Sequence, residues 1–304
     1  MTLQQLAYFL AVARTRHFTR AAVEARVAQP SLSKQIHALE KELGAALFSR
    51  ARGNISLTPA GEALLPVASR ILSDVDTARL EVAELVGLRR GRVRVGATPS
   101  LCGSLFADVI KRYHDAYPGV RVSVTEGGSR DLVTALEAGD LDLALVIVSP
   151  ADADRALTVV PVLREELVVA SAEPLGVPRM RWTDLRGQPL VMFRPGYDLR
   201  ETTLAECRRA GFEPEFAVEG GEMDAVLRFV EVGLGVAVVP STVLAARSLH
   251  GTPLTPGAGR TVALAHRTDV APTSAGRAFR DVLLGFLRGA ELPAGVRAVG
   301  SAGS

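Results

Sequence analysis

The fold of the N-terminal part of this chain is decided by residues 19–43, TRAAVEARVAQPSLSKQIHALEKEL. Thr19 predicts a helix start, because its side chain can accept a backbone N–H as an N-cap, and residues 21–26 favour a short helix. After a break at 27–29, Pro30 suits the first turn of a second helix, where its missing N–H has no partner to lose. The second helix has one apolar stripe with steps of three and four residues, formed by Leu32, Ile36, Leu39 and Leu43.

The remaining face of this second helix carries hydroxyl and cationic side chains. These are Ser31, Ser33, Lys34 and His37, which all lie off the apolar stripe. Two helices joined by a tight turn, the second with such a face, predict a helix-turn-helix that enters the major groove of DNA. An ordinary helical hairpin with a solvated face would show the same short pattern, so these residues alone leave both interpretations open.

Charge is unevenly distributed along the 304 residues, a length that suggests about two domains. Residues 1–58 contain eight Lys and Arg against three Asp and Glu, whereas the whole chain has a net charge of only +2. A hydrophobic content of 48% and a charged content of 22% are those of a soluble globular protein. A basic head on a slightly acidic body predicts a phosphate-binding module attached to a second domain.

A wing and a long helix are predicted after the helix-turn-helix. Residues 47–50 and 55–57 form two short extended pieces around a Gly-Asn turn, and this hairpin places Arg50 and Arg52 at its tip, in reach of the DNA backbone or minor groove. Thr58 and Pro59 then start a helix that we expect to continue to about residue 88.

The apolar residues of this long helix alternate four and three apart, a 3.5-residue seam. They are Leu64, Ala68, Ile71, Val75, Ala78, Val82 and Leu85, with Pro66 expected to kink the helix. We interpret the seam as the contact of a homodimer. The alternative is that the helix packs on its own domain.

Beyond residue 91 the pattern changes to apolar strands alternating with helices, which predicts an α/β domain whose parallel sheet is covered on both faces. Residues 291–304 are rich in Ala, Gly, Pro and Ser, and we expect them to be disordered. Ligands of open parallel sheets bind at the carboxyl ends of the strands. The candidate ligand-binding residues there are Thr98, Ser100, Ser129, Val148, Phe193, Arg194, Tyr197, Gly221 and Glu222.

Four of the five strand ends precede a helix, whose first N–H groups favour an anion. The hypothesis is a small organic acid bound by Ser100 and Ser129, with Arg194 as its counter-ion. The alternative is that Arg194 is solvated and the serines only cap helices.

Other classes of function have less support. Cys102 and Cys207 lack a paired spacing and the five histidines lack metal-ligand spacing, so we expect bystander thiols, no metal and no cofactor in a cytoplasmic protein. The apolar run 6–13 has no preceding Lys or Arg, which argues against a secretory signal peptide. The other apolar runs are shorter than the ~20 residues that a membrane-spanning helix needs. An exported two-lobed solute-binding protein would leave the basic head unexplained. An enzyme would need a catalytic motif, and neither a nucleophile elbow nor a Walker loop is present in the sequence.

Five short motifs in the head resemble those of the LysR-type transcriptional regulators. They are Phe18-Thr19-x-Ala21-Ala22, Ala28-Gln29-Pro30-Ser31-Leu32-Ser33, Gln35-Ile36-x-x-Leu39-Glu40, Leu43-Gly44-x-x-Leu47-Phe48-x-Arg50 and Leu57-Thr58-x-x-Gly61. In the second half, the segments 91–96, 138–144 and 233–240 are similar to the effector domain of the same family.

The resemblance implies an α/β protein with an N-terminal winged helix-turn-helix (1–58), a dimerising linker helix (59–90) and a two-lobed doubly wound effector domain (91–290) similar to periplasmic binding proteins. Lobe I would comprise about 91–163 and 266–290, and lobe II about 164–265. It further implies a homodimer that assembles into a homotetramer on double-stranded promoter DNA, an effector bound between the lobes, and RNA polymerase as a further candidate partner.

The DNA-binding residues that the motifs predict are Thr19, Gln29, Pro30, Ser31, Ser33, Lys34, His37, Arg50 and Arg52. His37 departs from the family pattern, which often has Arg or Lys at this position. Since histidine is mostly neutral at pH 7, the contact expected at this position is in doubt.

Overall fold

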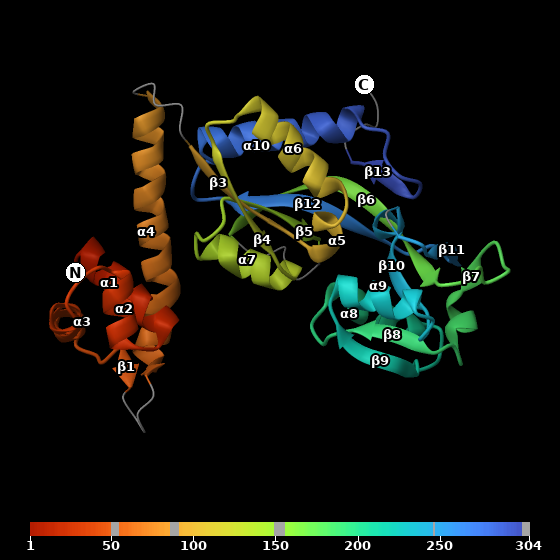
Figure 1. Ribbon diagram of the computed structural model, residues 1–304, viewed down its shortest axis with the longest axis horizontal. Coiled ribbons are helices and arrows are strands. Elements are labelled where there is room, and N and C mark those ends of the chain that lie inside the picture. Colours follow the sequence, from red (N-terminus) through yellow and green to blue (C-terminus); the bar gives the residue numbers. More distant parts are fainter. Residues whose placement is uncertain (50–54, 86–90, 149–155, 246, 300–304) are drawn as a thin grey trace. The chain divides into compact units, whose positions relative to one another are not determined.

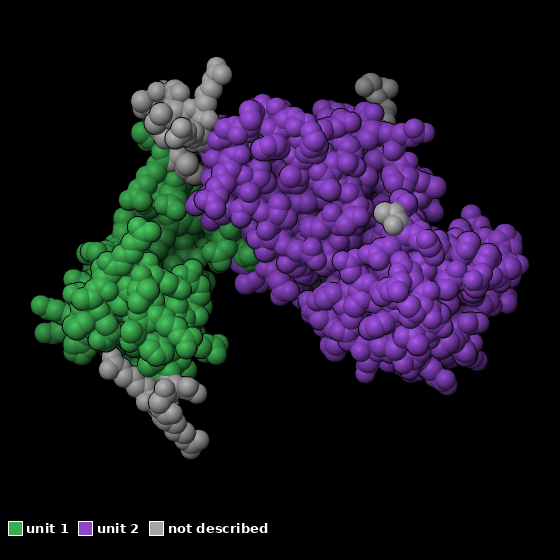
Figure 2. Space-filling model, viewed as in Figure 1, with its two compact units in different colours: residues 1–88, 135–140 green, residues 89–134, 141–304 purple. Residues whose placement is uncertain are grey.

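The computed structural model describes residues 1–49, 55–85, 91–148, 156–245 and 247–299 (Figure 1). The chain forms two compact units, one of residues 1–88 with 135–140 and one of residues 89–134 with 141–304 (Figure 2). The first unit contains the helix-turn-helix region, and the second contains the alternating strands and helices.

A small helical bundle forms the start of the first unit. Its helices are α1 (Leu3–Thr15), α2 (Phe18–Glu24) and α3 (Gln29–Leu43). Leu32, Ile36 and Leu39 are fully buried in the core of the bundle, as the apolar stripe predicted. Gly44 ends α3 in the left-handed conformation, with φ of 69°, which glycine adopts without steric cost. The helix-turn-helix is therefore held together by the residues that the sequence pattern selected.

The prediction that Thr19 caps α2 is wrong. The helix begins at Phe18, and its N-cap is His17, whose Nδ1 accepts a hydrogen bond from the backbone N–H of Thr19 at 3.2 Å. The acceptor thus comes from an imidazole two residues earlier. The side chain of Thr19 stays exposed and is not needed to start the helix.

A two-stranded hairpin follows, as predicted. β1 (Phe48–Ser49) pairs antiparallel with β2 (Ser56–Leu57), and Phe48 lies opposite Leu57. Phe48 also packs against Phe9, with the ring centroids 5.4 Å apart, so the base of the hairpin is anchored in the core of the bundle. The predicted tip, with Arg50 and Arg52, lies outside the described residues.

The long helix α4 (Pro59–Leu85) starts where Thr58 and Pro59 predicted it, and the Oγ1 of Thr58 accepts a hydrogen bond from the N–H of Gly61 at 3.1 Å. Pro66 lies inside α4 without ending it.

The first half of the α4 seam packs on its own domain. Ala68 is fully buried, and Leu64 and Ile71 contact the core of the bundle. Val82, in the second half, is 60% exposed. The local-packing alternative therefore applies to the first half of the seam, and a contact with a second copy remains a prediction for the second half.

A mixed β-sheet runs through the second unit, in the order β4-β3-β5-β12-β6-β11-β7. The strands are β3 (Arg92–Ala97), β4 (Arg121–Glu126), β5 (Leu143–Ile147), β6 (Leu157–Ser171), β7 (Met180–Arg181), β11 (His250–Thr255) and β12 (Gly259–Arg267). β10 (Ala237–Pro240) and β13 (Val296–Ala298) also pair with β6, while β8 (Leu190–Phe193) pairs with β9 (Phe216–Gly221).

Helices connect and cover these strands. They are α5 (Pro99–Cys102), α6 (Leu105–Ala116), α7 (Ser129–Glu137), α8 (Asp198–Arg209), α9 (Met223–Glu231) and α10 (Ser274–Gly289), with 3-10 turns η3 (Trp182–Leu185) and η4 (Ser241–Leu244). In Figure 1, α6 and α10 lie on the same side of the sheet. Phe106 and Tyr113 of α6 contact the ring of Phe279 on α10, with centroid distances of 6.1 and 5.2 Å.

The second unit has two lobes, each with its own hydrophobic core. The core of lobe I is drawn from residues 93–163 and 262–296, and that of lobe II from residues 167–254. β6 and β12 cross from one lobe to the other, and β6 pairs with β12 and β13 in its first part and with β10 and β11 in its last part. The chain passes from the core of lobe I to that of lobe II between residues 163 and 167, and returns between residues 254 and 262. The lobe boundaries expected at 163 and 265 stay predictions.

Two sequence expectations differ from the structure. The sheet is not wholly parallel, because β12 returns from lobe II and pairs antiparallel with both β5 and β6. The segment predicted to be disordered also contains β13, which pairs antiparallel with β6 through Val296, a residue buried in lobe I. The composition of this segment does not indicate a strand, because the strand depends on one buried valine and on pairing with Glu165, which is 131 residues away from Val296. Residues 300–304 lie outside the described part.

Candidate functional site

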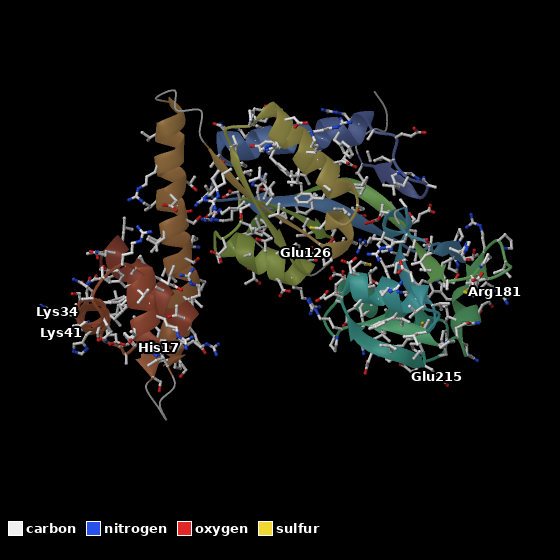
Figure 3. All side chains as sticks on the ribbon, viewed as in Figure 1. His17, Lys34, Lys41, Glu126, Arg181 and Glu215 are labelled. Atoms are coloured by element: carbon white, nitrogen blue, oxygen red, sulfur yellow. The ribbon has the colours of Figure 1, made fainter. Side chains whose placement is uncertain are left out.

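Helix α3 presents an exposed face opposite its buried stripe. Pro30, Lys34, His37 and Lys41 follow one another at steps of four, three and four residues, and all are exposed. Lys34 and Lys41 point away from the helical bundle (Figure 3). A cationic helix face of this kind is what a major groove admits.

Of the other predicted DNA-binding residues in the described part, Gln29, Ser31 and Ser33 lie at the start of α3, and Thr19 lies in α2. Gln29, Ser31 and Thr19 are exposed, and Ser33 is half-buried. The structure thus brings the short polar side chains and Lys34 together at the N-terminal end of α3. Arg50 and Arg52 cannot be placed, because they lie outside the described residues.

His37 has one acidic neighbour. Its Nδ1 lies 3.7 Å from Oε2 of Glu40, a contact that is ionic only when the imidazole is protonated. Oε1 of Glu40 accepts the backbone N–H of Leu47 at 2.9 Å, so Glu40 also fixes the turn between α3 and the hairpin. The ring of His37 itself is largely exposed, with 84% of its side chain accessible.

In the second unit, the residues predicted to bind a ligand come from both lobes, as expected for the ends of strands. We call this set of nine residues the strand-end site. Ser129, at the start of α7, accepts the backbone N–H of Ile147 at 3.0 Å and donates to Oδ2 of Asp198 at 2.8 Å. Asp198 begins α8 in lobe II, so this hydrogen bond joins the two lobes. Ser129 therefore has a structural role in this state.

Arg194 is held by two carboxylates. Its Nε forms a close hydrogen bond with Oε1 of Glu222, and its Nη2 lies 3.9 Å from Oδ2 of Asp131 in lobe I. The hydrogen bond to Glu222 is the main reason that the pKa of Arg194 is raised, so the guanidinium is firmly cationic. An acidic ligand would compete with these two carboxylates for Arg194.

Sequence reasoning missed a buried charge network next to Ser100. Arg260 of β12 donates from Nη2 to Oγ of Ser100 at 2.5 Å and to Oε1 of Glu165 at 2.9 Å. Glu165 is fully buried on β6, and its Oε2 accepts the hydroxyl of Thr242 at 3.2 Å. Thr98 is 3.2 Å from Ser100 between hydroxyl oxygens. A buried charge needs such partners, because removing it from water otherwise costs several kcal/mol.

Tyr197 has a buried hydroxyl that hydrogen-bonds to no residue in the described part of the chain. Its ring stacks on Phe193 with centroids 4.6 Å apart, and the guanidinium carbon of Arg194 lies 5.9 Å from its centroid. Burial is the main reason that its pKa is raised, so the hydroxyl remains protonated and can donate. An unpaired buried donor costs free energy, which an acceptor on a ligand would recover.

The remaining predicted residues differ in their exposure to solvent. Thr98 and Ser100 are buried, Val148 is 40% exposed, and Gly221 is half-buried. The Cβ of any other residue at Gly221 would lie 3.0 Å from a methyl of Val226, so this position favours glycine for packing reasons.

A separate cavity of about 650 Å³ lies between α5 of lobe I and α9 and η4 of lobe II. Pro99, Gly103, Met223 and Leu227 are among its lining residues, and none of the nine predicted residues is. Its charged groups are joined to one another, since Arg247 pairs with both Asp224 and Glu231. No local sequence pattern indicates this cavity, because its walls come from elements distant along the chain.

The two thiols are chemically quiet. Burial is the main cause that raises the pKa of Cys102 to about 11, with the nearby charge of Glu126 as a second cause. Burial likewise raises the pKa of Cys207 to about 11. Since the thiolate is the reactive form, both cysteines are poor nucleophiles at neutral pH.

Metal ligands and membrane-spanning helices are not found among the described residues. In these ranges, no cluster of three or more His, Cys, Asp or Glu residues is arranged to hold a metal ion. No helix in the described part of the chain combines the length and apolar character needed to cross a lipid bilayer.

The short helical bundle, hairpin and long helix define a winged helix-turn-helix protein, and the second unit adds a two-lobed α/β domain. Residues 3–62 match the model of the bacterial regulatory helix-turn-helix protein of the lysR family, and residues 87–288 match the LysR substrate binding domain. The chain belongs to the LysR family of transcriptional regulators, whose members are not enzymes.

Relatives and solved structures agree with this assignment. The transcriptional dual regulator GltC of Bacillus subtilis is 34% identical over 250 residues, which cover 81% of this chain and 82% of that protein. A probable nitrogen assimilation transcriptional activator of Synechococcus elongatus is 33% identical over 248 residues and covers 80% of each chain. The structure is similar to that of a full-length OxyR variant from Pseudomonas aeruginosa, with a TM-score of 0.72, 26% identity and coverage of 93% of this chain and 94% of that one.

Proposed function

We propose that this LysR-type regulator binds a specific operator as a homodimer through the exposed face of α3. The observation that carries the proposal is the row Pro30, Lys34, His37 and Lys41 on the side of α3 opposite its buried stripe. Lys34 supplies a cation for a guanine edge or a phosphate, while Gln29, Ser31 and Ser33 supply short donors and acceptors for base edges. The exposed side chains of Ala78 and Val82, in the second half of the α4 seam, support pairing of two copies, which then assemble as a tetramer on promoter DNA and can contact RNA polymerase. The protein acts in the cytoplasm.

A lysine substitution tests the DNA-binding part. Lys34→Ala is expected to weaken binding by about 1–3 kcal/mol if Lys34 contacts a base, and to lower the slope of log Kd against log salt by about one if it contacts a phosphate. The assay is fluorescence anisotropy with labelled DNA from the region upstream of the protein's own gene, over a series of salt concentrations. Lys111→Ala is the matched control, since Lys111 is an exposed lysine on α6 that pairs with Asp115. Unchanged affinity and slope for Lys34→Ala would contradict the proposal.

The second part of the proposal concerns the effector, a small organic acid bound at the strand-end site. The unpaired hydroxyl of Tyr197 supports this, since it can donate to a carboxylate or carbonyl oxygen. The guanidinium of Arg260 beside Ser100 and that of Arg194 beside Tyr197 supply positive charge. The protonated state of both cysteines disfavours a redox effector.

A screen of small carboxylates against uncharged analogues, read by thermal stabilisation of the full-length protein, tests the effector proposal. Tyr197→Phe removes only the hydroxyl, and we expect it to weaken the binding of a carboxylate hit by about 0.5–1.5 kcal/mol or more. Tyr117→Phe is the matched control, because Tyr117 is 40% exposed. If uncharged analogues bind as well as carboxylates, and Arg194→Ala and Tyr197→Phe both leave affinity unchanged, the effector proposal fails while the DNA-binding proposal stands.

A further inference from the structure

We propose that a second cavity, on the face of β6 opposite the strand-end site, binds a small phosphate-type anion. The cavity has a volume of about 300 Å³ and is lined by Arg164, Arg179, Arg297 and Glu166 as its charged residues. Successive side chains of a strand point to opposite faces. Since Glu165 faces Arg260 and Ser100, its neighbours Arg164 and Glu166 face away from the strand-end site. The two sites therefore lie on opposite faces of β6.

The register of β13 brings two of these arginines together. Arg297 is the direct partner of Arg164 in the antiparallel pair of β13 and β6, visible as neighbouring strands in Figure 1. Side chains at such positions have Cβ atoms about 4.5–5.5 Å apart, and like charges there destabilise the pair. The register thus places two like charges side by side where β13 joins the sheet.

The positively charged side chains that line this cavity outnumber the carboxylates that could neutralise them. Glu166 lies 3.5 Å from Arg297 and is the single carboxylate among the described lining residues. No hydrogen bond or ion pair joins the guanidinium of Arg164 or Arg179 to another described residue. Three cations and one carboxylate leave a local charge of +2, which a dianion would neutralise.

The walls suit an oxyanion rather than an apolar ligand. Guanidinium groups bind phosphate oxygens in a bidentate manner, and three exposed arginines line this cavity. Gly257, Gly259 and Gly295 leave backbone without side chains along the wall. At Gly259 a Cβ would lie 2.9 Å from the carbonyl oxygen of Glu165, so the close approach of backbone requires glycine. A volume at the lower limit of small-ligand sites fits inorganic phosphate, pyrophosphate or a small phosphorylated metabolite.

The test is calorimetric titration of the full-length protein with pyrophosphate, inorganic phosphate and sulfate at constant ionic strength. We expect saturable binding of one pyrophosphate per chain, weaker binding of phosphate, and a loss of affinity of about tenfold or more in Arg164→Gln and in Arg179→Gln. Arg288→Gln, an exposed arginine in the last turn of α10, is the charge-matched control and should bind as the wild type does. Lys34→Gln controls for binding to the basic head and should also leave the titration unchanged.

Each outcome decides the proposal. It is overturned if no saturable binding of pyrophosphate is seen, if Lys34→Gln abolishes the binding, or if Arg164→Gln and Arg179→Gln bind as tightly as Arg288→Gln. Arg179 precedes β7 and is outside the β6–β13 ladder, so its variant separates loss of the anion site from loss of β13 pairing. Hydrogen exchange at Val296–Ala298 gives an independent readout, because bound anion should slow exchange there by removing the repulsion between Arg164 and Arg297.

Discussion

Replacing Arg260 by methionine tests the buried charge network beside the strand-end site. The substitution keeps a long apolar side chain of similar reach but removes the guanidinium. Glu165, which is fully buried, then loses its cation and two hydrogen bonds, at 2.9 and 3.2 Å, and retains the one from Thr242. Ser100 loses its hydrogen bond from the same guanidinium.

The expected cost follows from the burial of both partners. Arg260 is 8% exposed and Glu165 0%, so solvent does little to screen the orphaned carboxylate. Removing one partner of such a pair destabilises a protein by about 3–5 kcal/mol. The double variant Arg260→Met/Glu165→Met removes both charges, and we expect it to recover most of that loss, since hydrophobic replacement of a buried pair is often neutral. The coupling free energy between positions 165 and 260 should therefore be large, and its sign should be opposite to that of the loss of stability in each single variant.

Urea unfolding followed by the fluorescence of Trp182 measures this effect. Trp182 is the single tryptophan of the chain and is buried in the core of lobe II. With a slope of about 3 kcal/mol per molar urea, a loss of 3–5 kcal/mol lowers the midpoint by about 1–1.7 M. A midpoint within about 0.2 M of wild type for Arg260→Met, or a double variant less stable than either single one, would refute this account of the network.

Three further predictions concern other regions. Because the pKa values of Cys102 and Cys207 are both raised to about 11, their alkylation by iodoacetamide at pH 7.5 should be about 100-fold slower than that of a thiol of ordinary pKa. The alkylation rate should then increase about tenfold per pH unit up to pH 10. A rate that does not change with pH would contradict this prediction. The double substitution Val75→Asp/Val82→Asp on α4 should convert dimers to monomers in sedimentation velocity at unchanged helix content by circular dichroism, whereas a dimer that persists would place the contact elsewhere. Leu39→Ala should destabilise the helical bundle by about 2–5 kcal/mol, because Leu39 is fully buried, and thermal unfolding within about 1 °C of wild type would show that the stripe is not the core.

The helix-turn-helix could be predicted from the sequence because its signals are local. Pro30 and Gly44 delimit α3, and the 3.6-residue period of its apolar residues selects the buried face within 15 residues of chain. The N-cap of α2 was missed because two residues that lie two positions apart can each offer an acceptor, and the backbone placed the ring of His17, not the hydroxyl of Thr19, at the helix end.

The sheet and the strand-end site depend on contacts that are distant in sequence. Hydrophobic runs predicted where strands occur, but an apolar run does not record whether its partner is parallel, so the antiparallel return of β12 was not foreseen. Arg260 and Glu165 are 95 residues apart, and each has the sequence appearance of an ordinary surface charge. The sequence pattern assigned Ser100 and Ser129 to strand ends, and their role in ligand binding stays a prediction. The residues that hydrogen-bond to these two serines could not be predicted, because they lie far away along the chain.

The docking of β13 has a consequence for any shortened form of this protein. Val296 to Ala298 occupy the backbone groups of β6 from Leu163 to Glu165 on the side away from β12. A chain cut after α10 would leave these N–H and C=O groups open at the middle of β6, the longest strand in the described part of the chain, next to buried apolar side chains. Unpaired strand backbone of this kind recruits strands from other molecules, so such a truncation should promote self-association even though it removes no part of either lobe's helices.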